Sequence, residues 1–392
     1  MKSSDKFEIV GRYKASRKDV MHLFDFDGQR LMSGAGNLKQ LYVMEPGGNF
    51  ETVKAHRGKM IEEALFFDES IWPLYSFKSG LARVDGSSSV IQEITYPLSN
   101  LSKSDDSKLL VLQVNSNYLP ESQAVFGLVG AGGDQCFYEL RLPPKFGVYF
   151  GFTVHSKSKS VLFFARGPEQ DCFCSLDIES LSGGSPIHLS LEDIEAHQLV
   201  FEGPSRIELV SDEYVVALVN AYSKATTTEL VKIWLNGRTD HQVLTIHDTW
   251  SGVIEVTERN GKIFCSAARP NSDELPHDMR QRGLYECDFE AGEPNLLLEY
   301  YEYGDGLHIL CPLGLFFVGK QHLTDSYSSH LDTDSGNLFY DLDEGELKLL
   351  TEVPRMGFYS LYRDGVVILG DRSHSKSPNG GGDTFTAIRE KS

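Results

Sequence analysis

The chain has 392 residues, of which 41% are hydrophobic, so it can bury a sizeable core. Its formal net charge of −19 argues against general nucleic-acid binding, because phosphate groups would be repelled. No apolar run approaches the ~20 residues of a membrane-spanning helix, and Met1–Glu8 lacks the apolar segment of a secretory signal. We therefore expect a cytoplasmic protein without a membrane or nucleic-acid partner.

Short apolar bursts separated by Gly, Asp, Ser and Asn predict strands and turns along the whole chain. The strand-rich blocks are, in chain order, 19–53, 64–96, 108–142, 148–191, 207–247, 253–303, 308–353 and 358–388. Most blocks predict four strands, but the block at 108–142 lacks an obvious fourth. Short connector helices are expected near 56–66 and 190–199, the second because Ser190–Asp193 is similar to a capping box.

Two segments of the chain repeat one pattern. Gly283–Asp288 leads to Gly292-Glu293, and Gly336–Asp341 leads to Gly345-Glu346. In both, a glycine precedes an aromatic strand that ends in aspartate. The two aspartates lie 341 − 288 = 53 residues apart, which is the length scale of one propeller blade.

The repeat and the evenly spaced blocks resemble a β-propeller over nearly the whole chain. We therefore expect one all-β domain over residues 1–392, an eight-bladed propeller of four-stranded antiparallel sheets, with seven blades as the alternative. Because Phe7–Tyr13 has no partner and the last block ends at its third strand, Thr384–Ile388, pairing these two strands would close the ring. Repeated WD40 or kelch motifs are missing, so the resemblance assigns no functional residues.

Positive residues recur at one structural position. The predicted second strand ends in a cation in five blocks, at Lys78, Arg166, Arg269, Lys320 and Arg372. In a propeller these positions share a face with the loops that link successive blades, so they predict a partial cationic collar. Arg280 and His374 join the same candidate set. Such a collar suits a carboxylate or phosphate ligand, whereas ion pairing between neighbouring blades is the structural alternative.

Long polar loops at 270–283, 321–336 and 373–383 are expected on the same face. They carry the candidate acid–base residues His277, His322 and His330. A divalent metal ion is an alternative role for these loops, although no ligand spacing matches a known metal motif. The glycines of Gly127–Gly133 are similar to a dinucleotide fingerprint, but a strand rather than a helix is predicted after them.

Two functions stay open. The first is a non-catalytic module that binds an anionic ligand or a protein partner on the loop-rich face. The alternative is a lyase or hydrolase acting on an acidic sugar or another small anion, metal-assisted or not. In that version Arg269, Lys320 and Arg372 would neutralise the substrate and one of the loop histidines would move the proton. Fold alone does not choose between them.

Overall fold

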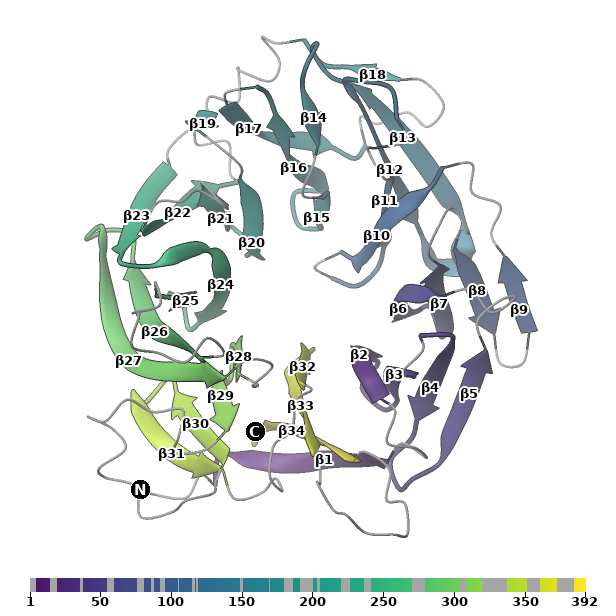
Figure 1. Ribbon diagram of the computed structural model, residues 1–392. Helices are drawn as coiled ribbons and strands as arrows, with labels where there is room; N and C mark the ends of the chain where they lie inside the picture. Colours follow the sequence, from purple (N-terminus) through teal and green to yellow (C-terminus); the bar gives the residue numbers. More distant parts are fainter. Residues whose placement is uncertain are drawn as a thin grey trace. The chain divides into compact units, whose positions relative to one another are not determined.

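The architecture is that of a computed structural model. It describes residues 5–14, 20–35, 38–54, 60–75, 81–85, 88–91, 96–104, 106–114, 117, 119–148, 151–168, 170–179, 186–190, 200–202, 205–219, 226–235, 241–269, 279–303, 308–318, 337–350, 360–371 and 384–392. The fold is an all-β propeller of eight blades, as the sequence predicts (Figure 1). Each blade is built around four antiparallel strands, which follow one another in the chain except in blade 8, where β1 joins the last three strands. The described residues contain no helix that is long and apolar enough to span a membrane.

The chain groups into two compact units, and unit 1 comprises residues 1–61, 253–288 and 294–392. Its sheets are blade 1, with β2 (Val20–Phe26), β3 (Leu31–Ala35), β4 (Gln40–Met44) and β5 (Phe50–Lys54); blade 6, with β24 (Trp250–Arg259), β25 (Lys262–Ala268), β26 (Met279–Asp288) and β27 (Glu293–Tyr303); blade 7, with β28 (His308–Cys311), β29 (Gly314–Val318), β30 (Asn337–Asp341) and β31 (Glu346–Leu350); and blade 8, with β32 (Ser360–Arg363), β33 (Val366–Asp371), β34 (Thr384–Glu390) and β1 (Phe7–Lys14).

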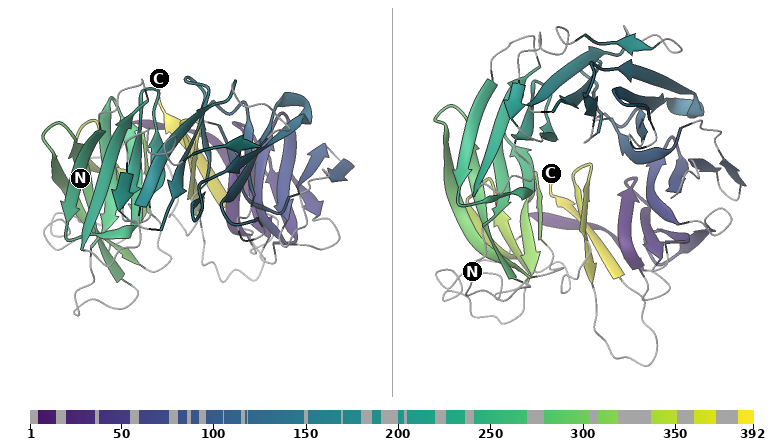
Figure 2. Two further views of the ribbon diagram at one scale, coloured as in Figure 1. Left: turned by 90° about the horizontal axis from the view of Figure 1, so that it is seen from above. Right: turned by 45° about the horizontal axis from the view of Figure 1, so that its top comes forward.

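Unit 2 comprises residues 62–252 and 289–293, and its strands can be followed by colour in Figure 2. Its sheets are blade 2, with β6 (Ile61–Phe67), β7 (Ser70–Tyr75), β8 (Ala82–Asp85) and β9 (Ser88–Ile91); blade 3, with β10 (Leu98–Lys103), β11 (Leu110–Val114), β12 (Gln123–Val129), β13 (Gln135–Arg141) and the short parallel β18 (Ile187–His188); blade 4, with β14 (Gly147–Val148), β15 (Thr153–His155), β16 (Ser160–Arg166), β17 (Gln170–Asp177) and β19 (Val200–Glu202); and blade 5, with β20 (Arg206–Val210), β21 (Tyr214–Val219), β22 (Thr227–Trp234) and β23 (His241–His247).

Alternating apolar side chains of neighbouring blades form shared cores. In unit 2, Phe126 of β12 packs with Phe152 and Phe163 of blade 4 in one buried cluster. In unit 1, Phe7 of β1 contacts the rings of Phe316 and Phe339 of blade 7 at centroid separations of 5.6 and 4.9 Å. Burial of such rings, each worth ~2–3 kcal/mol, joins the blades within each unit.

The predicted pairing of the first and last strands is confirmed. β1 runs antiparallel to β34, from Phe7 opposite Glu390 to Lys14 opposite Thr384. A network of charges, which we call the closure network, lies at this junction. Lys6 Nζ is 2.9 Å from Asp341, 2.8 Å from Asp343 and 3.2 Å from Glu390. Arg259 donates to Asp343 and Glu390, and Lys348 donates to Asp341.

Two glutamates occupy equivalent positions on the first strands of blades 2 and 6, and each accepts a hydrogen bond from the next blade. In unit 2, Glu63 of β6 accepts a hydrogen bond from the Leu101 amide of β10 at 2.7 Å. In unit 1, Glu255 of β24 accepts the Leu310 amide of β28 at 3.1 Å. Each carboxylate thus accepts a hydrogen bond from a backbone donor at the edge of the neighbouring sheet, and the Leu101 amide also donates to Asn100 Oδ1 at 2.7 Å.

The turns that follow these glutamates make a second equivalent contact. Asp68 and Asn260 each lie five residues after the glutamate of their blade (68 − 63 and 260 − 255). Each begins a turn with a positive φ angle, 48° at Asp68 and 52° at Asn260. The Gly132 amide donates to Asp68 at 2.6 Å, and the Asn260 side chain donates to Asp343 at 2.8 Å. Gly132 belongs to the glycine-rich run, which therefore forms the turn between β12 and β13 of blade 3 and contacts blade 2; a strand rather than a helix follows it, so it has no dinucleotide-binding context.

Two details of the sequence prediction are corrected. Residues 61–67 form strand β6, so the helix expected at 56–66 is wrong over that part. Blade 3 lacks no fourth strand, because its first strand is β10, Leu98–Lys103, ahead of the predicted block. The helix expected at 190–199 lies outside the described residues beyond Ser190. The single-domain assignment stays a prediction.

Candidate ligand-binding site

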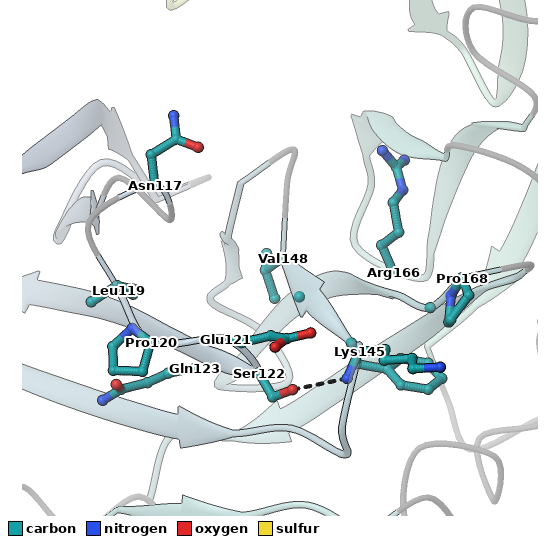
Figure 3. A pocket seen from close by; sticks show the side chains of 13 residues that line it. Asn117, Leu119, Pro120, Glu121, Ser122, Gln123, Lys145, Val148, Arg166 and Pro168 are labelled. Atoms are coloured by element: carbon teal, nitrogen blue, oxygen red, sulfur yellow. Dashed lines mark hydrogen bonds between the residues drawn. The ribbon is translucent and has the colours of Figure 1, made fainter.

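A pocket of about 430 Å³ opens between blades 3 and 4 of unit 2 (Figure 3). Its volume lies in the range of small-molecule sites. The residues that line it are Asn117, Leu119, Pro120, Glu121, Ser122, Gln123, Lys145, Phe146, Gly147, Val148, Arg166, Gly167 and Pro168. Polar and charged side chains therefore share the pocket with an apolar wall.

Three connections supply these residues. The first joins β11 to β12, the second joins blade 3 to blade 4, and the third joins β16 to β17. In a propeller these are the loops of one face, which is the face on which the sequence predicts the ligand site. Pairing of Gly147 with Arg166 joins β14 to β16 and fixes the second loop beside the third.

Two non-glycine residues of the pocket have left-handed backbone conformations. The φ angles are 66° at Ser122 and 70° at Lys145, and the Lys145 amide donates to the Ser122 hydroxyl at 3.0 Å (Figure 3). Such conformations are uncommon outside glycine and cost on the order of 1 kcal/mol each. The hydrogen bond holds the two strained turns together, and strain of this kind often accompanies binding sites.

Arg166 is held in place by a buried carboxylate. Its Nε lies 3.0 Å from Asp171 Oδ1, and its Nη2 lies 2.9 Å from Asp171 Oδ2. Asp171 is 2% exposed and also accepts the Ser205 amide at 2.7 Å. The guanidinium is thus fixed on one side, while Arg166 lines the pocket.

Two further charges line the pocket. Lys145 and Glu121 are both exposed, and neither side chain makes a hydrogen bond or ion pair with the residues that the structure describes. In Figure 3 the Glu121 carboxylate points toward the middle of the pocket, on the side of Lys145. Among the described residues, none competes with a ligand for either group.

The apolar wall is rigid. Phe146 and Val148 are buried, and a Cβ added at Gly167 would lie 2.7 Å from the Phe146 ring. Glycine at 167 therefore allows the close packing of Phe146 beneath the loop. Leu119, Pro120 and Pro168 complete the apolar lining.

The other predicted collar residues are placed as follows. Arg269, at the end of β25, forms an ion pair with Glu299, and Arg280 is exposed on β26. Both belong to unit 1, whereas Arg166 belongs to unit 2. The predicted site residues outside the described ranges are Lys78, His277, Lys320, His322, His330, Arg372 and His374. The collar as a whole stays a prediction.

A polar cluster in unit 1 was not found from the sequence. His308 Nε2 lies 3.4 Å from Glu255, and the His308 ring contacts that of Tyr300. Burial alone would raise the pKa of Glu255, but His308, the charge of Arg282 and the Leu310 amide together lower it. The residues of this cluster lie on different strands and match no sequence motif, so only the fold brings them together.

Arg282 extends this cluster into the core of blade 6. It is 1% exposed, and its Nε donates to the Ser266 hydroxyl at 3.0 Å. The Ser266 and Tyr300 hydroxyls are 2.6 Å apart. The described residues contain no group of three or more His, Cys, Asp or Glu side chains suited to a metal ion.

Comparison with known proteins supports the fold and goes no further. No family model and no curated protein sequence matches the chain. The Dos1 propeller is similar with a TM-score of 0.54 and 12% identity, over 97% of this chain and 94% of that chain. The WD40 domain of SCAP from fission yeast gives 0.51 and 9%, over 99% and 98%. A streptogramin B lyase structure gives only 0.42 and 8% over all of both chains, which carries no argument.

Proposed function

We propose that this propeller is a binding module for a small molecule that carries an anionic group, which occupies the pocket between blades 3 and 4. The observation that carries the proposal is the joint presence of Lys145 and Arg166 in a pocket of about 430 Å³. Lys145 supplies a mobile point charge, and Arg166 supplies a fixed planar donor. Both contact a ligand from the face on which propeller loops lie.

The expected affinity is modest. A charge-assisted hydrogen bond contributes ~1.5–3 kcal/mol when partly desolvated. Solvent screens the exposed Lys145, and Asp171 already offsets much of the Arg166 charge. The apolar wall adds burial of a ligand's hydrocarbon part, so affinities in the micromolar to millimolar range are expected.

Binding rather than catalysis is favoured by the ionisable groups of the pocket. Among the described residues that line it, these groups are Glu121, Lys145 and Arg166. General acid–base chemistry near neutral pH usually needs a histidine or a carboxyl of raised pKa, and the described lining residues include no histidine. The lyase or hydrolase alternative therefore gains no support from this site.

Isothermal titration with hexanoate at low ionic strength tests the proposal. We expect measurable binding to the wild type and ~10-fold weaker binding to Lys145→Gln, because one charged contact is lost. Lys262→Gln is the matched control, because Lys262 is an exposed lysine of β25 outside the pocket. Equal affinity of the wild type and Lys145→Gln would overturn the proposal, and so would the absence of hexanoate binding to the wild type.

A further inference from the structure

The pocket presents charges of both signs to its ligand. Lys145 and Arg166 are positive, whereas Glu121 in the lining and Asp171 behind Arg166 are negative. These four formal charges, counted over the residues that the structure describes, sum to zero. A ligand with one net negative charge would therefore meet an unfavourable contact at Glu121 as well as favourable ones at the cations.

Resting on the proposed function, we propose that the natural ligand is a zwitterion, an α-amino acid with an apolar side chain. Its carboxylate contacts Lys145 and Arg166, and its ammonium contacts Glu121. Its side chain packs on the wall formed by Phe146 and Val148. This arrangement satisfies every charge that the pocket offers, which a simple carboxylate does not.

The positions of the groups support this assignment. Glu121 and Ser122 are adjacent, and the Ser122 hydroxyl accepts the Lys145 amide at 3.0 Å. The two strained turns thus hold the backbone of Glu121 beside that of Lys145. Neither charged side chain is bonded to another described residue, so a ligand displaces no ion pair within the part of the chain that the structure describes.

Three compounds of one chain length separate the contributions. Norleucine has both charges, hexanoate has only the carboxylate and hexylamine has only the ammonium group. We expect wild-type protein to bind norleucine ~10-fold tighter than hexanoate in isothermal titration, and hexylamine most weakly. Glu121→Gln should abolish the advantage of norleucine over hexanoate, because its amide carries no charge.

Glu45→Gln serves as the matched control, since Glu45 is exposed and lies in unit 1, outside the pocket. It should leave all three affinities unchanged. Equal binding of norleucine and hexanoate to the wild type would overturn the zwitterion assignment and leave the anion-binding function standing. So would a norleucine advantage that survives in Glu121→Gln. Failure of hexanoate to bind the wild type would overturn the proposed function itself.

Discussion

Asp171 accepts hydrogen bonds from Arg166 on both carboxylate oxygens, at 3.0 Å from Nε and 2.9 Å from Nη2. It also accepts a hydrogen bond from the Ser205 amide at 2.7 Å. One buried carboxylate therefore links the pocket to the connection between blades 4 and 5. The arginine that could contact a ligand is also part of the structural framework of unit 2. Stability and binding are coupled at this residue.

Replacing Asp171 with alanine should reduce the free energy of unfolding by ~2–3 kcal/mol, because it removes the buried carboxylate that accepts hydrogen bonds from both Arg166 and the Ser205 amide. Urea denaturation measures this change. Asp212→Ala is the control, since Asp212 is mostly exposed and its ion pair within the described part of the chain is with exposed Lys157. A similar loss in both variants would show that Asp171 has no special structural role.

Lys145→Gly should separate stability from binding. Glycine adopts a φ of 70° without steric strain, so the variant should be more stable by ~0.5–1 kcal/mol. It removes the side-chain charge, so hexanoate binding should weaken. Thermal denaturation and titration on the same sample check both effects, and a destabilised variant would contradict the strain argument.

The closure network predicts a pH dependence. Hydrogen bonds from Arg259 and then Lys6 hold the pKa of Asp343 well below its usual range, and burial opposes them only in part. A carboxyl whose pKa is lowered by folding stabilises the fold at pH values above its ordinary pKa of 3.8. This contribution is lost as the pH falls toward the pKa of the folded state.

Asp343→Asn should therefore lower stability by ~1 kcal/mol at pH 7, a value limited by solvent screening. The difference from wild type should shrink steadily as the pH falls below about 4, where the unfolded carboxyl becomes protonated. Urea midpoints between pH 3 and 7 measure this trend. A constant difference over that range would mean that the Asp343 charge does not contribute.

The two equivalent glutamates of the first strands should behave alike. Glu63→Ala and Glu255→Ala each remove a charged acceptor of a neighbouring backbone amide, which should cost ~1–3 kcal/mol in free energy of unfolding. Glu255 has additional partners in His308 and Arg282, so its loss should be the larger. Glu51→Ala, at an exposed site on β5, is the control. A larger loss for Glu63→Ala would refute the ranking.

Blade number and ring closure could be predicted from the sequence because alternating strands and turn residues repeat throughout the chain. β10 was missed because its Ser99 and Asn100 are polar and exposed, so the strand lacks a clear alternation. β6 was mistaken for a helix because Ile61, Ala64 and Leu65 have helical spacing. In the structure these residues are buried within blade 2 instead.

The site could be predicted only in part. Arg166 was selected because a cation ends its strand, and it does line a pocket. Lys145 and Glu121 were missed because they lie in loops whose contact depends on two separate turns. The left-handed conformations of Ser122 and Lys145 leave no mark in residue type, since neither residue is glycine or asparagine.

A crystal structure of the protein soaked with 6-bromohexanoate tests the central claim most directly. Anomalous scattering would place the bromine independently of the carboxylate density. The account predicts bromine against the wall of Phe146 and Val148, with the carboxylate within hydrogen-bonding distance of Lys145 Nζ and the Arg166 guanidinium. Bromine bound elsewhere, with this pocket empty at saturating ligand, would contradict it.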